Sequence, residues 1–302
     1  MKYLMEKPDH PADVVLDTDT YNEIDDQFAL AYLIRKAPEL RLKAIFAAPF
    51  INQRASSPEE GMERSFEEIH NVLTLMKRDD LKDMVFRGSG RFLENESTPV
   101  HSDAANELIR LAREHTAEDP LYVIAIAAIT DVASALLIDP EIKDRIAVVW
   151  LGCHVPEWPV NDEFNFRQDI AAARVVFQSG VRMTLLPCKG VVSHFMTTEY
   201  ELRHWMTGKN ALSDYLMNAT ISHAKEIGKS PYWSKQIWDV TAVAWLLKGN
   251  FMKDRMIPAP LPEYDLTWNK KTLDHEIRYV YWINRDDLME DLFQTLTEDA
   301  DA

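Results

Sequence analysis

Five carboxylates lie close together in the sequence, directly after a short apolar run. The stretch VVLDTDTYNEIDD places them within ten consecutive positions, at Asp17, Asp19, Glu23, Asp25 and Asp26. Carboxylates at this density repel one another unless water, hydrogen bonds or a cation offset the charge. Asp17 and Asp19 follow an apolar run that predicts a buried strand, where an unpaired charge is costly. Solvation alone therefore does not account for this loop.

Three explanations are compatible with such a loop. Several carboxylate oxygens can bind a hard cation such as Ca²⁺ or Mg²⁺, which offsets their repulsion. Two carboxyl groups with separated pKa values can instead act as acid and base without a metal. Finally, carboxylates near Asp25 can favour the positive end of a following helix. Helix capping explains only one or two of the acids, so we favour a cation.

The composition limits the possible binding partners and the cellular compartment. The chain has 302 residues and a net charge of −16, which disfavours nucleic acid and anionic membranes as partners. No run approaches the roughly 20 apolar residues of a membrane span, and the N-terminal stretch does not resemble a signal peptide. The two cysteines, Cys153 and Cys188, are expected to be buried thiols in a reducing compartment. We therefore expect a cytoplasmic protein.

Strand-like and helix-like segments alternate along most of the chain. The expected strands are VVLD (14–17), RLKAIFAA (41–48), MVFRG (84–88), LYVIAIAAI (121–129), IAVVWLG (146–152) and VRMTLLP (181–187). The expected helices between them cover 26–36, 57–77, 102–115, 131–139 and 169–180. After about residue 190 the pattern is mostly helical, with a late strand at 276–283 and a terminal helix.

This order predicts an α/β fold with an open, mostly parallel central sheet and helices on both faces. No linker or repeat divides the chain, so we expect a single domain over 1–302, with a helical cap in its C-terminal third. Ligands of such sheets bind beyond the carboxyl ends of the strands. The acidic loop follows the first strand and is expected at that edge.

Four segments together resemble the inosine–uridine-preferring nucleoside hydrolases. DTDTYNEIDDQFAL is similar to the family signature DxDPGxDDAxAL, and AAITDVASAL (127–136) to GPLTNVAxAL. EFNFRQDIAAARVVF (163–177) is similar to EFNxxxDPEAAxxVF, and WDVTAVAWLL (238–247) to HDPxAxxxxL. The four occur in the family's order, which makes the resemblance specific. It implies a Ca²⁺-dependent hydrolase of the N-glycosidic bond of ribonucleosides or related ribosides, acting on a small molecule as a homodimer or homotetramer.

The resemblance also implies roles for individual residues. The Ca²⁺ ligands would be Asp19, Asp26, Asp239 and the main-chain carbonyl of Thr130. Their oxygens, with water and sugar hydroxyls, agree with the six to eight oxygen ligands of Ca²⁺. The metal would lower the pKa of a bound water, and Asp19 would take its proton as the general base.

The other residues matched to the family would bind the sugar. Asp25 would accept a hydrogen bond from the ribose 2′-hydroxyl, and Glu163 and Asn165 would hold hydroxyls on the opposite side. Asp17 would support the metal site from behind. Nearby carboxylates would stabilise the oxocarbenium character that develops on the sugar.

The loop itself departs from the family pattern. Five residues rather than three separate Asp19 from the Asp25–Asp26 pair, which adds Asn22 and Glu23. The family has an asparagine after its second strand, near the position of Pro49 here, and we expect Asn22 to make that sugar contact instead. Glu23 has no counterpart in the signature, and we place it as a supporting residue behind the site.

The leaving-group side departs as well. Trp238 stands where many members carry a histidine that protonates the departing base. An indole can stack on a base but cannot act as a general acid. We consider His101 and His154 as replacement acids, because His154 follows an expected strand end and His101 lies in a loop before a helix.

Two other functions remain open from the sequence. VVLDTDTY also fits the strand and DxDxT motif of haloacid dehalogenase-type phosphatases, although a convincing lysine motif and a late acidic motif are missing. A catalytically silent ribose- or nucleoside-binding protein would keep the metal and sugar site while losing turnover. The substituted histidine and the altered loop are compatible with this second alternative.

Overall fold

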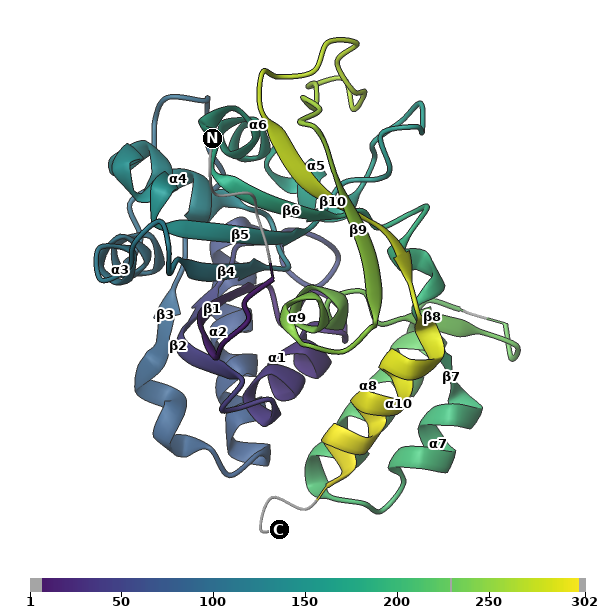
Figure 1. Cartoon of the computed structure of the whole chain (residues 1–302). Coiled ribbons are helices and arrows are strands. Elements are labelled where there is room, and N and C mark those ends of the chain that lie inside the picture. Colours follow the sequence, from purple (N-terminus) through teal and green to yellow (C-terminus); the bar gives the residue numbers. More distant parts are fainter. Residues whose placement is uncertain (1–6, 229, 299–302) are drawn as a thin grey trace.

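The structure is a computed structural model that describes residues 7–228 and 230–298. Within these residues an eight-stranded sheet runs through the centre of the molecule in the order β3-β2-β1-β4-β5-β6-β10-β9 (Figure 1). All neighbouring pairs are parallel except β10 and β9. This confirms the predicted open, mostly parallel sheet.

The strands of this sheet are short and mostly buried. They are β1 (Ala12–Thr18), β2 (Leu40–Ala47), β3 (Val85–Arg87), β4 (Leu121–Ala125), β5 (Ile146–Leu151), β6 (Arg182–Leu186), β9 (Met252–Pro258) and β10 (Glu276–Ile283). The central strands β4 and β5 are buried at every position, as apolar strands covered on both faces must be.

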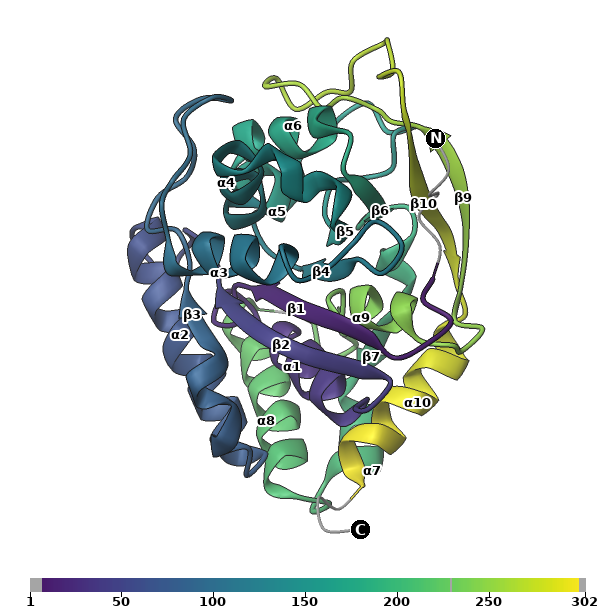
Figure 2. The same ribbon diagram turned by 60° about the vertical axis from the view of Figure 1, so that its left-hand side comes forward.

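Helices cover both faces of the sheet. The longer helices are α1 (Asp26–Arg35), α2 (Pro58–Leu75), α3 (Asp103–Ala112), α4 (Thr130–Ile138), α6 (Ile170–Ser179), α7 (Glu199–Met206), α8 (Ala211–Glu226) and α10 (Arg285–Thr297). Two shorter ones are α5 (Phe164–Gln168) and α9 (Val240–Leu246). Helices α3, α4 and α6 pack together on one face, and α1 and α9 lie on the other (Figure 2).

Local sequence signals define several helix ends. The Ser102 hydroxyl accepts a hydrogen bond from the Ala105 amide and caps α3. Helix α6 ends at Gly180, whose φ of 73° is readily adopted by a residue without a side chain. Thr198 and Glu201 form a capping box at the start of α7.

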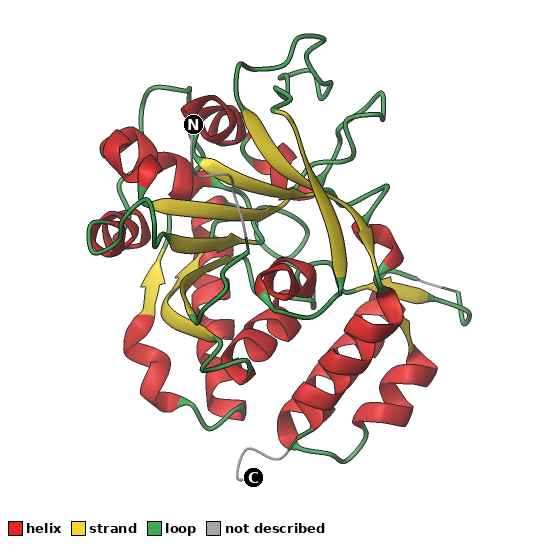
Figure 3. Ribbon diagram, in the orientation of Figure 1, coloured by secondary structure: helices red, strands yellow, loops and turns green. Residues whose placement is uncertain are grey.

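The C-terminal third contains the predicted helical region. Helices α7, α8 and α10 gather at one end of the molecule, beside the small antiparallel pair β7 (Met196–Thr198) and β8 (Ser234–Gln236) (Figure 3). The structure also contains β9, which the sequence did not indicate because charged residues interrupt its apolar pattern. Among the described residues, no helix has the length and apolar character needed to cross a membrane.

One strand is shorter than its apolar run. The run from Leu121 to Ile129 predicted nine strand residues, but β4 ends at Ala125. The following residues turn toward α4 and stay fully buried, where the Trp150 indole donates a hydrogen bond to the Ala127 carbonyl. Burial, rather than strand pairing, explains why the run remains apolar.

Candidate active site

A cavity of about 550 Å³ lies at the carboxyl ends of the central strands. The loop after β1 contributes Asp19, Asn22, Glu23, Asp25 and Asp26 to its lining. Residues that follow β2, β4, β5 and β6 form other walls, and α8 contributes His223 and Ile227. This is the edge at which open parallel sheets bind ligands.

Four buried aspartates line the cavity: Asp19, Asp25, Asp26 and Asp239. None of these residues is more than 5% exposed. Burial raises the pKa of each group, and repulsion between the carboxylates raises it further; the pKa of Asp26 reaches about 7. The cavity therefore stabilises any positive charge that enters it.

Asp19 is the acidic residue best placed to bind such a charge. Both of its carboxylate oxygens are buried, and neither has a hydrogen-bond partner. Asp26 differs, because it accepts a 2.5 Å hydrogen bond from the Thr18 hydroxyl. Among the residues that the structure describes, no three His, Cys, Asp or Glu side chains are already arranged as a metal-binding group. The unpartnered, oxygen-rich donors nevertheless fit a hard cation such as Ca²⁺.

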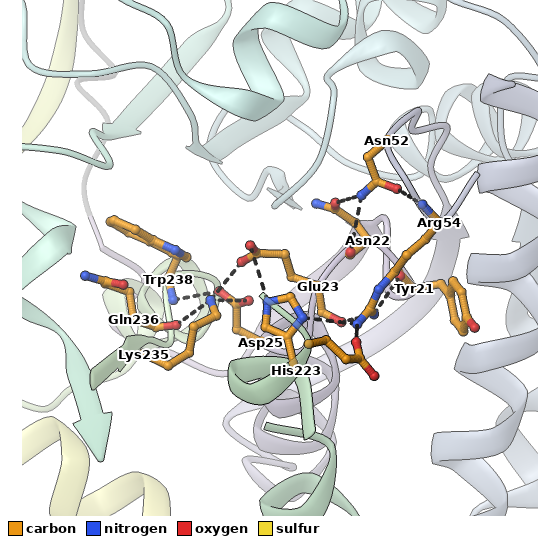
Figure 4. Close-up of polar contacts among 11 residues, drawn as sticks. Tyr21, Asn22, Glu23, Asp25, Asn52, Arg54, His223, Lys235, Gln236 and Trp238 are labelled. Atoms are coloured by element: carbon orange, nitrogen blue, oxygen red, sulfur yellow. Dashed lines mark hydrogen bonds and ion pairs between the residues drawn. The ribbon is translucent and has the colours of Figure 1, made fainter. Parts of the chain in front are cut away.

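Asp25 is held by two donors from the C-terminal part of the chain (Figure 4). The Lys235 ammonium lies 3.3 Å from its Oδ1, and the Trp238 amide donates to its Oδ2 at 2.8 Å. Burial alone would lower the pKa of Lys235, but Asp25 and Glu23 outweigh this and raise it. Lys235 is therefore a permanent positive charge beside the cavity.

Glu23, the additional acid of the loop, pairs with the same lysine. Its Oε2 lies 2.7 Å from the Lys235 ammonium. Burial would raise the pKa of Glu23, but Lys235 outweighs this and lowers it. Glu23 also lines the cavity, so it stands in the wall itself rather than behind it.

On the opposite wall, Glu163 and Asn165 are held firmly. The Glu163 carboxylate accepts hydrogen bonds from the amides of Asn165, Phe166 and Cys153, at 3.1, 2.8 and 2.9 Å. It thereby caps the short helix α5. The Asn165 side chain donates to the Leu151 carbonyl at 3.0 Å. Both side chains line the cavity, as does Cys188.

Asn22 also lines the cavity, together with a residue that the sequence did not suggest. The Asn52 amide donates to the Asn22 side-chain oxygen at 2.8 Å (Figure 4). Asn52 follows β2 three residues beyond Pro49. Asn22 in the loop after β1 and Asn52 in the loop after β2 therefore both line the cavity.

Three residues predicted to bind the metal or to act as acids do not line the cavity. His101 is exposed in the loop before α3. His154 is buried against Trp158, with its ring nitrogen accepting from the Lys189 amide at 3.4 Å. Thr130 opens α4, and its hydroxyl donates to Asp169. Asp17, expected behind the site, is buried beside Asp131, and its charge contributes to the raised pKa of Asp19; its supporting role stays a prediction.

These placements correct the sequence-based expectations. The position of His154 after an expected strand end predicts a cavity residue, but the turn at Cys153, with φ of 63°, and the Asn161 side chain that accepts from the His154 amide place the ring elsewhere. The loop before α3 likewise leaves His101 outside the lining. At the end of β4 it is Ile126, not Thr130, that lines the cavity. Trp238 is half-buried and does line it.

A family model covers most of the chain. The model described as inosine-uridine preferring nucleoside hydrolase matches residues 14–277. The chain belongs to this family. It is accordingly an N-glycosyl hydrolase of the nucleoside hydrolase type, and the match includes the acidic loop, β4, α5 and the Trp238–Asp239 segment.

Individual relatives are distant. The chain is 25% identical over 260 residues to the pyrimidine-specific ribonucleoside hydrolase RihA of Salmonella enteritidis, a match that covers 78% of this chain and 79% of the relative. Among solved structures, a plant nucleoside hydrolase superposes with a TM-score of 0.74 at 16% identity, covering 96% of this chain and 100% of the other. An inosine-guanosine nucleoside hydrolase gives 0.72 at 15% identity, with coverages of 95% and 98%. At such identities the structural likeness establishes the fold alone.

Proposed function

We propose that the cavity hydrolyses the N-glycosidic bond of ribonucleosides or related ribosides, with Ca²⁺ as cofactor and Asp19 as general base. The observation that carries this proposal is the Asp19 carboxylate, which is fully buried at the cavity and has no partner on either oxygen. Such a group is stable only with a cation, a water or a proton at hand. The proposed reaction has Ca²⁺ as the cation, water as the nucleophile and a proton that Asp19 takes from this water.

The cation would be held by Asp19, Asp26 and Asp239. We add the Ile126 main-chain carbonyl in place of that of Thr130, because Ile126 lines the cavity beyond β4. When bound, Ca²⁺ would orient the sugar hydroxyls and lower the pKa of a coordinated water. Asp19 would accept that water's proton as the water attacks C1′ of the sugar.

The remaining lining residues would bind the sugar and stabilise its charge. Asp25 keeps acceptor capacity beyond its bonds to Lys235 and Trp238, since each carboxylate oxygen can accept twice, and it would take the ribose 2′-hydroxyl. Asn22, Glu163 and Asn165 would hold other hydroxyls. The buried carboxylates would stabilise the oxocarbenium character of the transition state.

On the base side, Trp238 offers an aromatic surface against which a base can stack. Trp238 also connects the two halves of the site, because its amide holds Asp25 while the next residue, Asp239, is a proposed ligand. We further propose that the chain acts as a single domain, in the cytoplasm, and as a homodimer or homotetramer.

The direct test is a substrate panel on the wild type, Asp19→Asn and Asp286→Asn. Uridine, inosine and p-nitrophenyl β-riboside report glycosidic hydrolysis, and p-nitrophenyl phosphate reports phosphatase activity. We expect Asp19→Asn to lower kcat by about 100-fold or more, as the loss of a general base does. Asp286 is an exposed acid on α10 that pairs with Arg285, and its variant should match the wild type.

Other outcomes would contradict the proposal. Release of p-nitrophenol from the phosphate alone would favour the phosphatase. Ribose or nucleoside binding to both the wild type and Asp19→Asn, with no turnover by either, would identify a silent binding protein.

A further inference from the structure

The cavity contains a second unpartnered buried group besides Asp19. Among the described lining residues, only Asp19 and His223 have buried side-chain polar atoms without a hydrogen-bond partner. The His223 atom is Nε2. The residue lies near the C-terminal end of α8 and is 4% exposed. A buried polar atom on a cavity wall is most stable when a ligand completes its hydrogen bonding.

Arg54 decides which ring nitrogen of His223 carries the proton. An Arg54 terminal nitrogen lies 3.1 Å from His223 Nδ1. A guanidinium can only donate, so Nδ1 must accept. The proton of the neutral ring is therefore on Nε2, which makes the unpartnered atom an N–H donor. Burial also lowers the pKa of His223, and Glu23 only partly opposes this.

Arg54 is itself held in place by three acceptors (Figure 4). It donates to the carbonyls of Tyr21 and Glu23, at 3.4 and 3.1 Å, and to the Glu226 carboxylate at 3.3 Å. The longer acidic loop therefore supplies two of the anchors for the residue that orients His223. Glu23, one of the two additional loop residues, therefore acts through its main chain as well as through its side chain.

Glu23 lies next to the free donor without satisfying it. Its Oε1 is 3.9 Å from His223 Nε2, beyond hydrogen-bond range. The other oxygen is held by Lys235 at 2.7 Å, which fixes the carboxylate. The charged groups that face His223 are thus Glu23, Arg54, Lys235 and Asp25. The Nε2–H remains available to an acceptor atom of a ligand in the cavity.

We infer that His223 donates a hydrogen bond through Nε2–H to the departing base during glycosidic cleavage. This assignment rests on the proposed function. When the C1′–N bond breaks, its electron pair passes to the base, and a fixed donor stabilises the negative charge that develops there. His223 stays neutral. The base gains one proton from solvent, and Asp19 returns to solvent the proton taken from water, so the proton balance closes.

A donor at His223 would stabilise the leaving base, which the other candidate residues do not. Trp238 cannot donate a proton as an acid, and neither His101 nor His154 lines the cavity. Substrates served by such a donor are nucleosides whose base carries a hydrogen-bond acceptor. Ribosides with a stable anionic leaving group, such as p-nitrophenolate, depend on it far less.

The test compares uridine with p-nitrophenyl β-riboside in three variants. His223→Leu removes the donor, whereas His223→Gln keeps an N–H group near the same place. His204→Leu is the control, because His204 is exposed on α7. We expect His223→Leu to lower kcat/KM for uridine by about 100- to 1,000-fold, the usual effect of losing one such donor. The loss for the p-nitrophenyl substrate should be at least about 30-fold smaller, and His223→Gln should recover most of the uridine activity.

Several results would overturn the assignment. These are equal losses on both substrates, an unchanged rate on uridine, or a glutamine variant as impaired as the leucine variant. ¹⁵N NMR of the imidazole ring tests the tautomer independently of activity, and a His223 ring with its proton on Nδ1 would contradict the role. A wild-type protein that cleaves neither substrate would refute the proposed function itself. The tautomer measurement does not depend on activity, so it still tests the role of His223 separately.

Discussion

The buried lysine beside the cavity gives the sharpest prediction about stability. Lys235 has 4% of its side chain exposed, and its ammonium contacts Glu23, Asp25 and the Gln236 carbonyl at 2.7, 3.3 and 2.8 Å. Lys235→Met keeps the aliphatic part of the side chain but removes the charge. Asp25, 1% exposed, is then left without its cationic partner.

The expected loss follows from the geometry of this pair. Removing one partner of a buried ion pair costs about 3–5 kcal/mol, because the other charge stays buried. An unfolding entropy of roughly 2.1 cal/mol/K per residue gives about 0.6 kcal/mol/K for 302 residues. The variant should therefore unfold about 5–8 °C below the wild type in a calorimetric or circular-dichroism melt.

Lys189→Met is the matched control. Lys189 lines the same cavity but is exposed, so the identical substitution should change the free energy of unfolding by no more than about 0.5 kcal/mol. If Lys235→Met melts within 1 °C of the wild type, or no lower than Lys189→Met, the buried pair is not holding the loop and the electrostatic argument is wrong.

Two further predictions concern other parts of the chain. Asp13 pairs with Arg41 and Lys43 at 2.5 and 3.0 Å; burial alone would raise its pKa, but the two cations outweigh this and lower it. Its folded pKa lies below its unfolded value of about 3.9, so the pairs stabilise the protein at neutral pH and lose this effect as the pH falls through the folded pKa. Asp13→Asn should cost about 1 kcal/mol at pH 7 in urea denaturation, and a difference that fails to shrink in acid would contradict this. His101→Gln should leave kcat/KM for uridine within about twofold of the wild type, and a 100-fold loss would return His101 to the site.

The sequence predicted the part of the site that is built from local segments. The acidic loop, the parallel sheet and the cavity at its carboxyl edge follow from an apolar run, from alternating elements and from the tendency of such sheets to bind ligands beyond the carboxyl ends of their strands. Asp239 and Asn165 could be placed because short motifs around them resemble those of the family. The Ile126 position was missed because the apolar run does not show where pairing in β4 stops.

The contacts between distant segments could not be predicted in this way. Glu23 and Lys235 are 212 positions apart, and Arg54 and His223 are 169 apart. The one local signal was the position of His223 on the apolar face of α8, where it follows Leu216 and Thr220 at helical spacing. That pattern indicates that His223 is buried but not that it lines a cavity. Its proposed role therefore depends on the three-dimensional structure.

Metal reconstitution shows whether glycosidic hydrolysis depends on a cation bound by Asp19 and its neighbours. The protein would be stripped with EDTA, dialysed and titrated with Ca²⁺, while hydrolysis of uridine and p-nitrophenyl riboside and the bound metal are measured together. We expect activity to disappear with the metal and return in proportion to about one Ca²⁺ per chain, and Asp19→Asn to lose both binding and turnover. Full hydrolysis by the stripped wild-type protein would refute a metal-dependent mechanism.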